Sequence, residues 1–107
     1  MIPTKKRVPR QKIPFILKKG HQRASNTLII RYMENFEVFH RTRTIVSKKI
    51  AKKAVTRNSV RRQIHGAILQ QTEATSQGYD IIIIPKKKIL DADFSTIKSD
   101  LSTIWIN

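Results

Sequence analysis

The 107-residue chain has no cysteine, three glycines and seven acidic residues. The lack of cysteine excludes disulfide bonds and thiolate zinc sites, and it suits a reducing compartment. Three glycines leave little material for a loop that wraps phosphates with backbone N–H groups. The longest uninterrupted apolar run covers 81–84, far short of the ~20 residues of a transmembrane helix. We therefore expect a cytoplasmic protein.

Basic residues, by contrast, are abundant. The chain has 22 lysines and arginines and a formal net charge of +15. Self-repulsion of that size opposes a compact state unless a polyanion neutralises it. Nucleic acid is the first candidate partner, and an anionic membrane surface is the second. Residues 1–20 lack the apolar stretch of a signal peptide. An organelle transit sequence is the alternative, although Phe15, Ile16 and Leu17 resemble core residues.

The apolar pattern predicts a single α+β domain over 1–107, without internal repeats or linkers. Residues 1–10 hold four basic residues and two prolines, so we expect a basic arm that is loosely ordered when unbound. After the arm we predict, in order, a helix over 11–19, strands over 26–33 and 41–47, a helix from Thr56 or Asn58 to Gln71, a strand within 79–88, and a helix beginning at Asp91 or Asp93.

The predicted strands differ in how they should be buried. The 26–33 strand places one set of side chains on a single face: Leu28, Ile30 and Tyr32. The 41–47 strand is expected to lie antiparallel to it, and 34–40 is ambiguous between turn and strand. The four isoleucines at 81–84 indicate a strand that is buried on both faces beside a parallel neighbour in a helix-covered sheet.

The predicted helices each have an apolar face. The first helix should bury Ile13, Ile16 and Leu17 and leave Phe15 to one side of that face. In the second helix, Gly66 costs about 0.5–1 kcal/mol relative to alanine, and it indicates close packing or a kink.

The sequence shows no catalytic or metal-binding constellation. Asp91 and Asp93 lie close together, but capping of a helix explains them. The three histidines (His21, His40 and His65) lack metal-ligand spacing, and no serine lies in a nucleophile motif. Any enzymatic chemistry is therefore expected to belong to a partner.

The clearest candidate site is the basic helix that opens "TRNSVRRQIH" at 56–65. Arg57, Arg61 and His65 are spaced four residues apart on one face, and Arg62 points about 100° further round. Asn58 can both donate and accept, and four lysines lie just upstream: Lys48, Lys49, Lys52 and Lys53. A helix start offers free N–H groups and partial positive charge, which suit a phosphate together with guanidinium groups. The alternatives are a solvated charged face and a helix lying on a membrane.

Two aromatic residues form a further candidate surface. Phe15 and Tyr32 could stack with bases between the first helix and the first strand, as in proteins that hold single-stranded RNA. The alternative is that both residues belong to the core.

Residues 46–65, "VSKKIAKKAVTRNSVRRQIH", resemble the signature of the bacterial ribonuclease P protein subunit. In that family a strand ends in Val-Ser/Ala-Lys-Lys, and a basic segment then leads to a helix with a loose Arg-Asn-Arg pattern and a basic pair. The matching residues here are Val46, Ser47, Lys48, Lys49, Arg57, Asn58, Arg61 and Arg62. Ser59 and His65 stand where the family usually has arginine. The second aromatic of the first helix falls near Lys18 or Lys19.

The resemblance implies an α/β sandwich in which helices cover a mixed four-stranded sheet, similar to the second domain of ribosomal protein S5 (domain 2-like), with a left-handed βαβ crossover. It also implies a protein that helps a catalytic RNA to cut the 5′ leader from precursor tRNA, with Mg²⁺ held mainly by the RNA subunit and the substrate. The residues by themselves leave two alternatives open. One is a general RNA-binding or ribosomal-type protein, and the other is a nuclease with its own active site.

The resemblance also implies roles for particular residues. The RNA subunit would be faced by Arg57, Asn58, Arg61, Arg62, His65, Lys48, Lys49, Lys52 and Lys53. A cleft between the first helix and the sheet would hold the leader of precursor tRNA. That cleft would be lined by Phe15, Tyr32 and Lys18.

Overall fold

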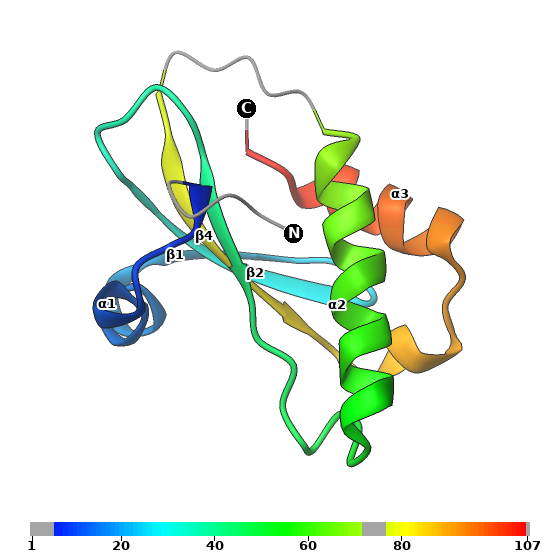
Figure 1. Cartoon of the computed structure of the whole chain (residues 1–107). Helices are drawn as coiled ribbons and strands as arrows, with labels where there is room; N and C mark the ends of the chain where they lie inside the picture. Colours follow the sequence, from blue (N-terminus) through cyan, green and yellow to red (C-terminus); the bar gives the residue numbers. More distant parts are fainter. Residues whose placement is uncertain (1–5, 72–76, 107) are drawn as a thin grey trace.

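The computed structural model describes residues 6–71 and 77–106. Four strands form one mixed sheet in the order β1-β2-β4-β3. The strands are β1 (His21–Ala24), β2 (Leu28–Glu34), β3 (Arg41–Thr44) and β4 (Tyr79–Pro85). The helices are α1 (Ile13–Lys19), α2 (Ala54–Leu69) and α3 (Phe94–Ile104), with 3-10 turns η2 (Arg10–Lys12) and η3 (Lys87–Asp91). Figure 1 shows α1 against one face of the sheet and α2 and α3 against the other. The predicted α+β sandwich is confirmed, and the handedness of its crossover stays a prediction.

Strand β4 lies inside the sheet, where it pairs with β2 antiparallel and with β3 parallel. Its side chains alternate between two apolar layers: Ile81 and Ile83 pack with the α2–α3 layer, whereas Ile82 packs with α1. All three are fully buried, which confirms the expectation from the isoleucine run. Strand β3 runs antiparallel to β2, as predicted for the 41–47 strand, and β4 lies between the two. Helix α2 carries the chain back over one face, so β3 and β4 run in the same direction.

The sequence pattern did not predict β1. All four of its residues are exposed, so no alternation of apolar and polar residues marks it as a strand. It pairs with β2 in antiparallel register, from His21 opposite Tyr32 to Ala24 opposite Ile29. Strand β1 therefore owes its conformation to the neighbouring strand.

The helix boundaries differ from the predicted ones in one place that matters for the site. Helix α2 begins at Ala54, before Thr56 and Asn58, and its N-cap residue Lys53 makes no side-chain capping bond. The expected cap of α3 is confirmed, because the carboxylate of Asp93 accepts a bond from the backbone N–H of Thr96. That bond lowers the pKa of Asp93.

Two packing predictions for the helices have opposite outcomes. A Cβ atom placed on Gly66 would lie 3.2 Å from the ring of Phe94, so this glycine marks close packing between α2 and α3. In α1, Ile16 is buried against the sheet and Ile13 is partly buried, but Leu17 is 38% exposed. A short helix covers only one strip of a sheet face, and Leu17 lies outside that strip.

The N-terminal segment is more ordered than predicted. Residues 1–5 of the expected loose arm lie outside the described residues. In the rest of the arm, Val8 is fully buried, and its N–H donates to the Thr42 carbonyl at 3.3 Å. Arg7 forms a parallel β-bridge with Thr42. Residues 6–10 are therefore held against the outer edge of β3, because one apolar side chain in the segment reaches the core under α1.

Candidate nucleic-acid interface

A groove with a cationic rim follows β3, the strand at one edge of the sheet. Helix α2 forms one wall, and the N-terminal segment with the start of α1 forms the other. Nearest α2, the groove is lined by Arg7, Thr42, Arg43, Thr44, Arg61, Arg62 and His65. Nearest α1, it is lined by Arg10, Ile13, Pro14, Arg43, Thr44, Ile45 and Arg61. The two parts share Arg43, Thr44 and Arg61 in their lining, so they adjoin along β3.

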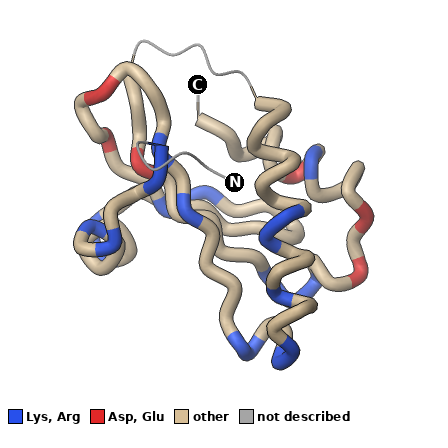
Figure 2. Tube along the Cα trace, in the orientation of Figure 1, with Lys and Arg blue, Asp and Glu red and all other residues tan. Residues whose placement is uncertain are grey.

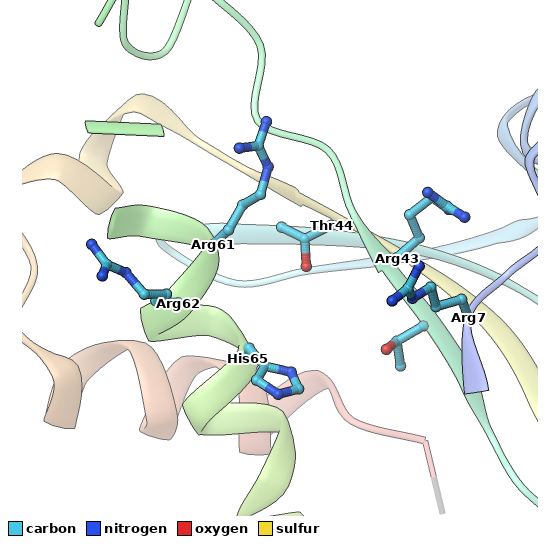
Figure 3. A pocket seen from close by; sticks show the side chains of 7 residues that line it. Arg7, Arg43, Thr44, Arg61, Arg62 and His65 are labelled. Atoms are coloured by element: carbon cyan, nitrogen blue, oxygen red, sulfur yellow. The ribbon is translucent and has the colours of Figure 1, made fainter. Parts of the chain in front are cut away.

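Figure 3 shows how side chains from different elements meet in the groove. His65 on α2 points toward the side of the gap where Arg7 and Arg43 lie, Arg61 extends along α2, and Arg62 extends away from β3. Two of the arginines are held by neutral acceptors. The guanidinium of Arg61 donates to the Asn58 side-chain oxygen at 2.6 Å, and Nε of Arg43 donates to the Val8 carbonyl at 2.9 Å. Each bond leaves other N–H groups of the same guanidinium directed elsewhere.

Positive charge is concentrated in the groove, which arginines from three elements line. Within the described part of the chain, Arg10, Arg43 and Arg61 form no ion pair, and the pair Arg41–Asp80 lies on the β3–β4 ladder instead. Burial, followed by the charges of Arg10 and Arg7, lowers the pKa of Arg43. In Figure 2 the acidic residues gather at the β2–β3 connection and around η3 and α3. The basic side of the molecule is therefore open to an external anion.

The predicted basic residues fall into three groups. Arg61, Arg62 and His65 line the groove. The four lysines are exposed on the connection between β3 and α2, next to the groove's α2 wall: Lys48, Lys49, Lys52 and Lys53. Arg57 and Asn58 make hydrogen bonds to other residues of the chain. Arg57 donates to the carbonyls of Ala51 and Lys52 at 3.0 and 2.6 Å, and Asn58 holds Arg61.

The sequence predicted that the N-terminus of the helix and its arginines bind the same anion, and the structure does not show this arrangement. Because α2 begins at Ala54, Arg61 lies two turns into the helix, about 10 Å of rise from its first residue. Arg57 is nearer the start, but its side chain turns back to the preceding loop. The free N–H groups of the first turn and the Arg61 guanidinium are therefore too far apart to bind the same phosphate.

The predicted aromatic cleft is wrong in one of its members. Phe15 and Lys18 are exposed on α1. Tyr32 packs instead with the core between the sheet and α2–α3, where its ring lies 5.7 Å from that of Tyr79. The guanidinium of Arg23 lies 5.5 Å from the same ring. Phe15 and Tyr32 are on opposite faces of the sheet, because alternate residues of a strand point to opposite sides.

The sequence did not single out three arginines of the groove: Arg7, Arg10 and Arg43. Arg7 and Arg10 were assigned to a loose arm. Arg43 lies within "RTRT", where arginine and threonine alternate as on a strand with one charged face. That alternation was a usable signal for a basic strand face. The pairing of Arg43 with the N-terminal segment depends on tertiary contacts.

His65 occupies a half-buried position in the groove wall. Burial lowers its pKa, so at neutral pH the imidazole is mostly uncharged. Its Nδ1 atom is buried and has no hydrogen-bond partner within the described residues. An imidazole in this state can accept or donate one bond to a bound polar group.

Three of the six described acidic side chains accept hydrogen bonds within the protein: Asp80, Asp93 and Asp100. Asp80 pairs with Arg41 at 2.6 Å, and Asp100 accepts from both the N–H and the hydroxyl of Thr27. Among residues 6–71 and 77–106, no three histidine or acidic side chains come together as metal ligands. No described helix is long and apolar enough to cross a membrane.

Comparison with known proteins agrees with the geometry. The family described as Ribonuclease P matches residues 3–107. A ribonuclease P protein component from a Thermoanaerobacter species is 37% identical over 86 residues, which cover 80% of this chain and 73% of that protein. The one from Caldanaerobacter subterraneus subsp. tengcongensis is 32% identical, over 88% of this chain and 80% of its own length.

Solved structures share the architecture. A Staphylococcus aureus RNase P protein mutant, described as having defective mRNA degradation activity, superimposes with a TM-score of 0.79 at 27% identity, covering 94% of this chain and 85% of that one. The RNase P protein from Thermotoga maritima gives a TM-score of 0.79 at 22% identity, covering 92% and 93%, and supports the fold alone. From the family match and these relatives, the chain belongs to the ribonuclease P protein component family.

Proposed function

We propose that the chain is the protein subunit of ribonuclease P and that the groove along β3 holds RNA phosphates. The observation that carries this proposal is that arginines from the N-terminal segment, β3 and α2 line the groove, and that three of them, Arg10, Arg43 and Arg61, form no ion pair among the described residues. Guanidinium groups bind phosphates through forked, charge-assisted hydrogen bonds. A protein with a net charge of +15 also gains electrostatically from any RNA that neutralises it.

The partners we propose are a catalytic RNA and precursor tRNA. The exposed lysines of the β3–α2 connection extend the rim of the groove beyond Arg61 and Arg62, and this extended surface would bind the RNA subunit. The 5′ leader would pass on the α1 side of the sheet. There Phe15 offers an exposed ring for stacking and Lys18 an exposed ammonium group.

We assign the catalytic chemistry to the RNA subunit rather than to this chain. The reaction would be endonucleolytic removal of the 5′ leader, with Mg²⁺ held by the RNA subunit and the substrate. Two of the described acids, Asp80 and Asp100, are engaged in internal bonds. The protein's residues would bind phosphates, hold the leader and lower the repulsion between two RNA chains.

Reconstitution tests the proposal directly. The protein is added to a bacterial ribonuclease P RNA and a labelled precursor tRNA at low Mg²⁺ and fixed salt, and the rate of correct 5′ cleavage is measured. We expect a large protein-dependent gain, a reduced gain with Arg61→Ala, and an unchanged gain with Lys98→Ala, which removes an exposed charge from α3. Suppose that the RNA comes from the same source as the protein, and that the protein binds it tightly without raising the cleavage rate. That result would favour a ribosomal-type RNA-binding protein instead.

A further inference from the structure

A cluster of aromatic rings outside the groove surrounds His40, the residue that precedes β3. The His40 ring lies 5.8 Å from the ring of Trp105, edge to face, and 5.9 Å from the ring of Tyr79, at the start of β4. Its Nδ1 atom accepts a hydrogen bond of 3.0 Å from the backbone N–H of Tyr79. An imidazole that accepts at Nδ1 carries its proton on Nε2, so the structure holds His40 in one neutral form.

The two residues after α3, Trp105 and Ile106, form a C-terminal segment that packs over this cluster. Helix α3 ends at Ile104, and the extended backbone of Trp105 carries the chain back toward the strands (Figure 1). Trp105 and Ile106 are 7% and 4% exposed, and both belong to the core between the sheet and α2–α3. The guanidinium of Arg23, on the edge strand β1, donates to the Trp105 carbonyl at 3.1 Å. The C-terminal segment is therefore attached to the sheet through the His40 ring and the Arg23 side chain.

Two buried polar groups make this attachment weaker than the rest of the core. Nε1 of Trp105 and Nε2 of His40 are both buried, and neither has a well-formed hydrogen bond within the described part of the chain. A buried donor without an acceptor costs free energy that water would recover. Because opening of the C-terminal segment would return both groups to water, we expect it to open more readily than the strands beneath it.

Protonation of His40 acts against the closed arrangement. The second proton would occupy Nδ1, which would then face the Tyr79 N–H as a donor instead of an acceptor. Burial lowers the pKa of His40, and the nearby backbone of Ile106 only partly opposes that shift. The closed state therefore binds the proton more weakly than an open state in which water reaches the imidazole. Closure is fully favoured above pH ~6.5 and weakens as the pH falls below that value.

The neighbouring charges do not compensate a protonated His40. Among the described residues His40 forms no ion pair, and the carboxylate of Asp80 is already bonded to Arg41 and Asn35. Glu34 lies opposite Tyr79 in the β2–β4 register, but its side chain is exposed. The titratable and charged side chains on the adjoining elements are His21 and Arg23 on β1, Tyr32 and Glu34 on β2, Arg41 on β3, Tyr79 and Asp80 on β4, and Glu37 in the turn before His40.

We propose that His40 is a proton switch for the C-terminal segment: when its imidazole takes up a proton, Trp105 and Ile106 leave the sheet while the four strands stay paired. The strands stay paired because Arg41 and Asp80 join β3 to β4, and because β4 is bonded along its length to β2 and β3. The switch does not depend on the proposed function, since none of its residues lines the groove.

Trp105 is the single tryptophan of the chain, so its fluorescence reports on the C-terminal segment directly. The full-length protein is titrated at fixed ionic strength from about pH 7.5 to about pH 5, the range in which histidine changes charge. Quenching by acrylamide is measured, because a protonated imidazole can itself quench an indole on contact without any opening. We expect the acrylamide quenching constant to rise severalfold in one transition below pH ~6.5, while far-UV circular dichroism keeps its helical signal. A constant value over the whole range would overturn the proposal, and so would a rise that coincides with loss of the helical signal.

Matched histidine variants assign the transition to one residue. His40→Asn offers an amide oxygen to the Tyr79 N–H and does not titrate in this range, so it should abolish the transition. His21→Asn is the control, because His21 is exposed at the edge of the same cluster, 5.5 Å from the ring of Tyr32. It should leave the transition in place. A transition that survives His40→Asn, or that His21→Asn removes, would refute the role of His40.

Two further measurements give a result even if His40→Asn does not fold. Arg23→Ala removes the bond to the Trp105 carbonyl, so it should raise the quenching constant at neutral pH and move the transition to higher pH. In the wild-type protein, hydrogen exchange followed by NMR should show the protection factor of the Tyr79 amide falling through the same transition, because its acceptor is His40. Amides of the β2–β4 ladder should keep their protection. A Tyr79 protection factor that does not change while Trp105 becomes accessible would contradict the coupling between His40 and the C-terminal segment.

Discussion

Asn58→Ala and Arg61→Ala should weaken RNA binding in two different ways. Arg61 lines both parts of the groove, and its guanidinium donates to the Asn58 side chain at 2.6 Å. Removing Arg61 deletes a cation from the site. Removing Asn58 leaves the cation in place but frees its side chain, because Asn58 itself carries no charge.

The expected magnitudes follow from these roles. If Arg61 contacts one RNA phosphate, Arg61→Ala should flatten the slope of log affinity against log salt concentration by about 0.7–0.9. Asn58→Ala should leave the slope unchanged. Binding must then immobilise a free arginine, at a cost of about 0.5–1.5 kcal/mol, which lowers affinity by about 2- to 12-fold at every salt concentration.

The assay is a salt series of RNA-subunit affinities for the wild-type protein and each variant. Lys98→Ala is the control, since it removes an exposed cation outside the groove. A slope that flattens equally with Asn58→Ala and Arg61→Ala would contradict the assignment of Asn58 as a support. A slope that Arg61→Ala leaves unchanged would contradict a phosphate contact by Arg61.

Three further predictions concern the fold that holds the groove. Asp80→Asn should lower the free energy of unfolding, measured in urea, by about 3 kcal/mol, because it leaves Arg41 without its carboxylate in a largely buried pair; a loss below about 1 kcal/mol would contradict this. Burial lowers the pKa of His40, so the folded state binds a proton more weakly than the unfolded chain. Stability should be fully present above pH ~6.5 and fall below it, and His40→Asn should weaken that dependence in melts across pH. Gly78→Ala should lower the melting temperature more than Gly66→Ala, because its Cβ would overlap backbone carbonyls of the 35–39 turn; equal losses would refute this.

The fold was predictable where a residue's neighbours in sequence decide its environment. The isoleucine run of β4 was correctly expected to be buried on both faces, and Asp93 was correctly expected among the caps of α3. The alternation in β2 was also correct, with Leu28 and Ile30 in one apolar layer. In each case a short pattern carries the information, because side-chain direction repeats with the local backbone period.

The site was predictable in part. The basic character of α2 and of its preceding connection is visible as sequence, and the resemblance at 46–65 pointed to the family that the comparisons confirm. The individual roles within the motif were not visible. Arg57 and Arg61 look equivalent at a spacing of four, yet one is bound to loop carbonyls and the other lines the groove.

By itself, the sequence determined that this is a compact α+β protein with a large excess of positive charge and a basic helix suited to phosphates. The tertiary structure decided where those charges meet. It placed the segment around Val8 against β3, lined one hollow with Arg10, Arg43 and Arg61, and put Tyr32 on the face away from Phe15. The physical reason is that these juxtapositions depend on which strands pair and which helix covers which face. Strand pairing is set by contacts between segments far apart in the chain, and local periodicity does not encode it.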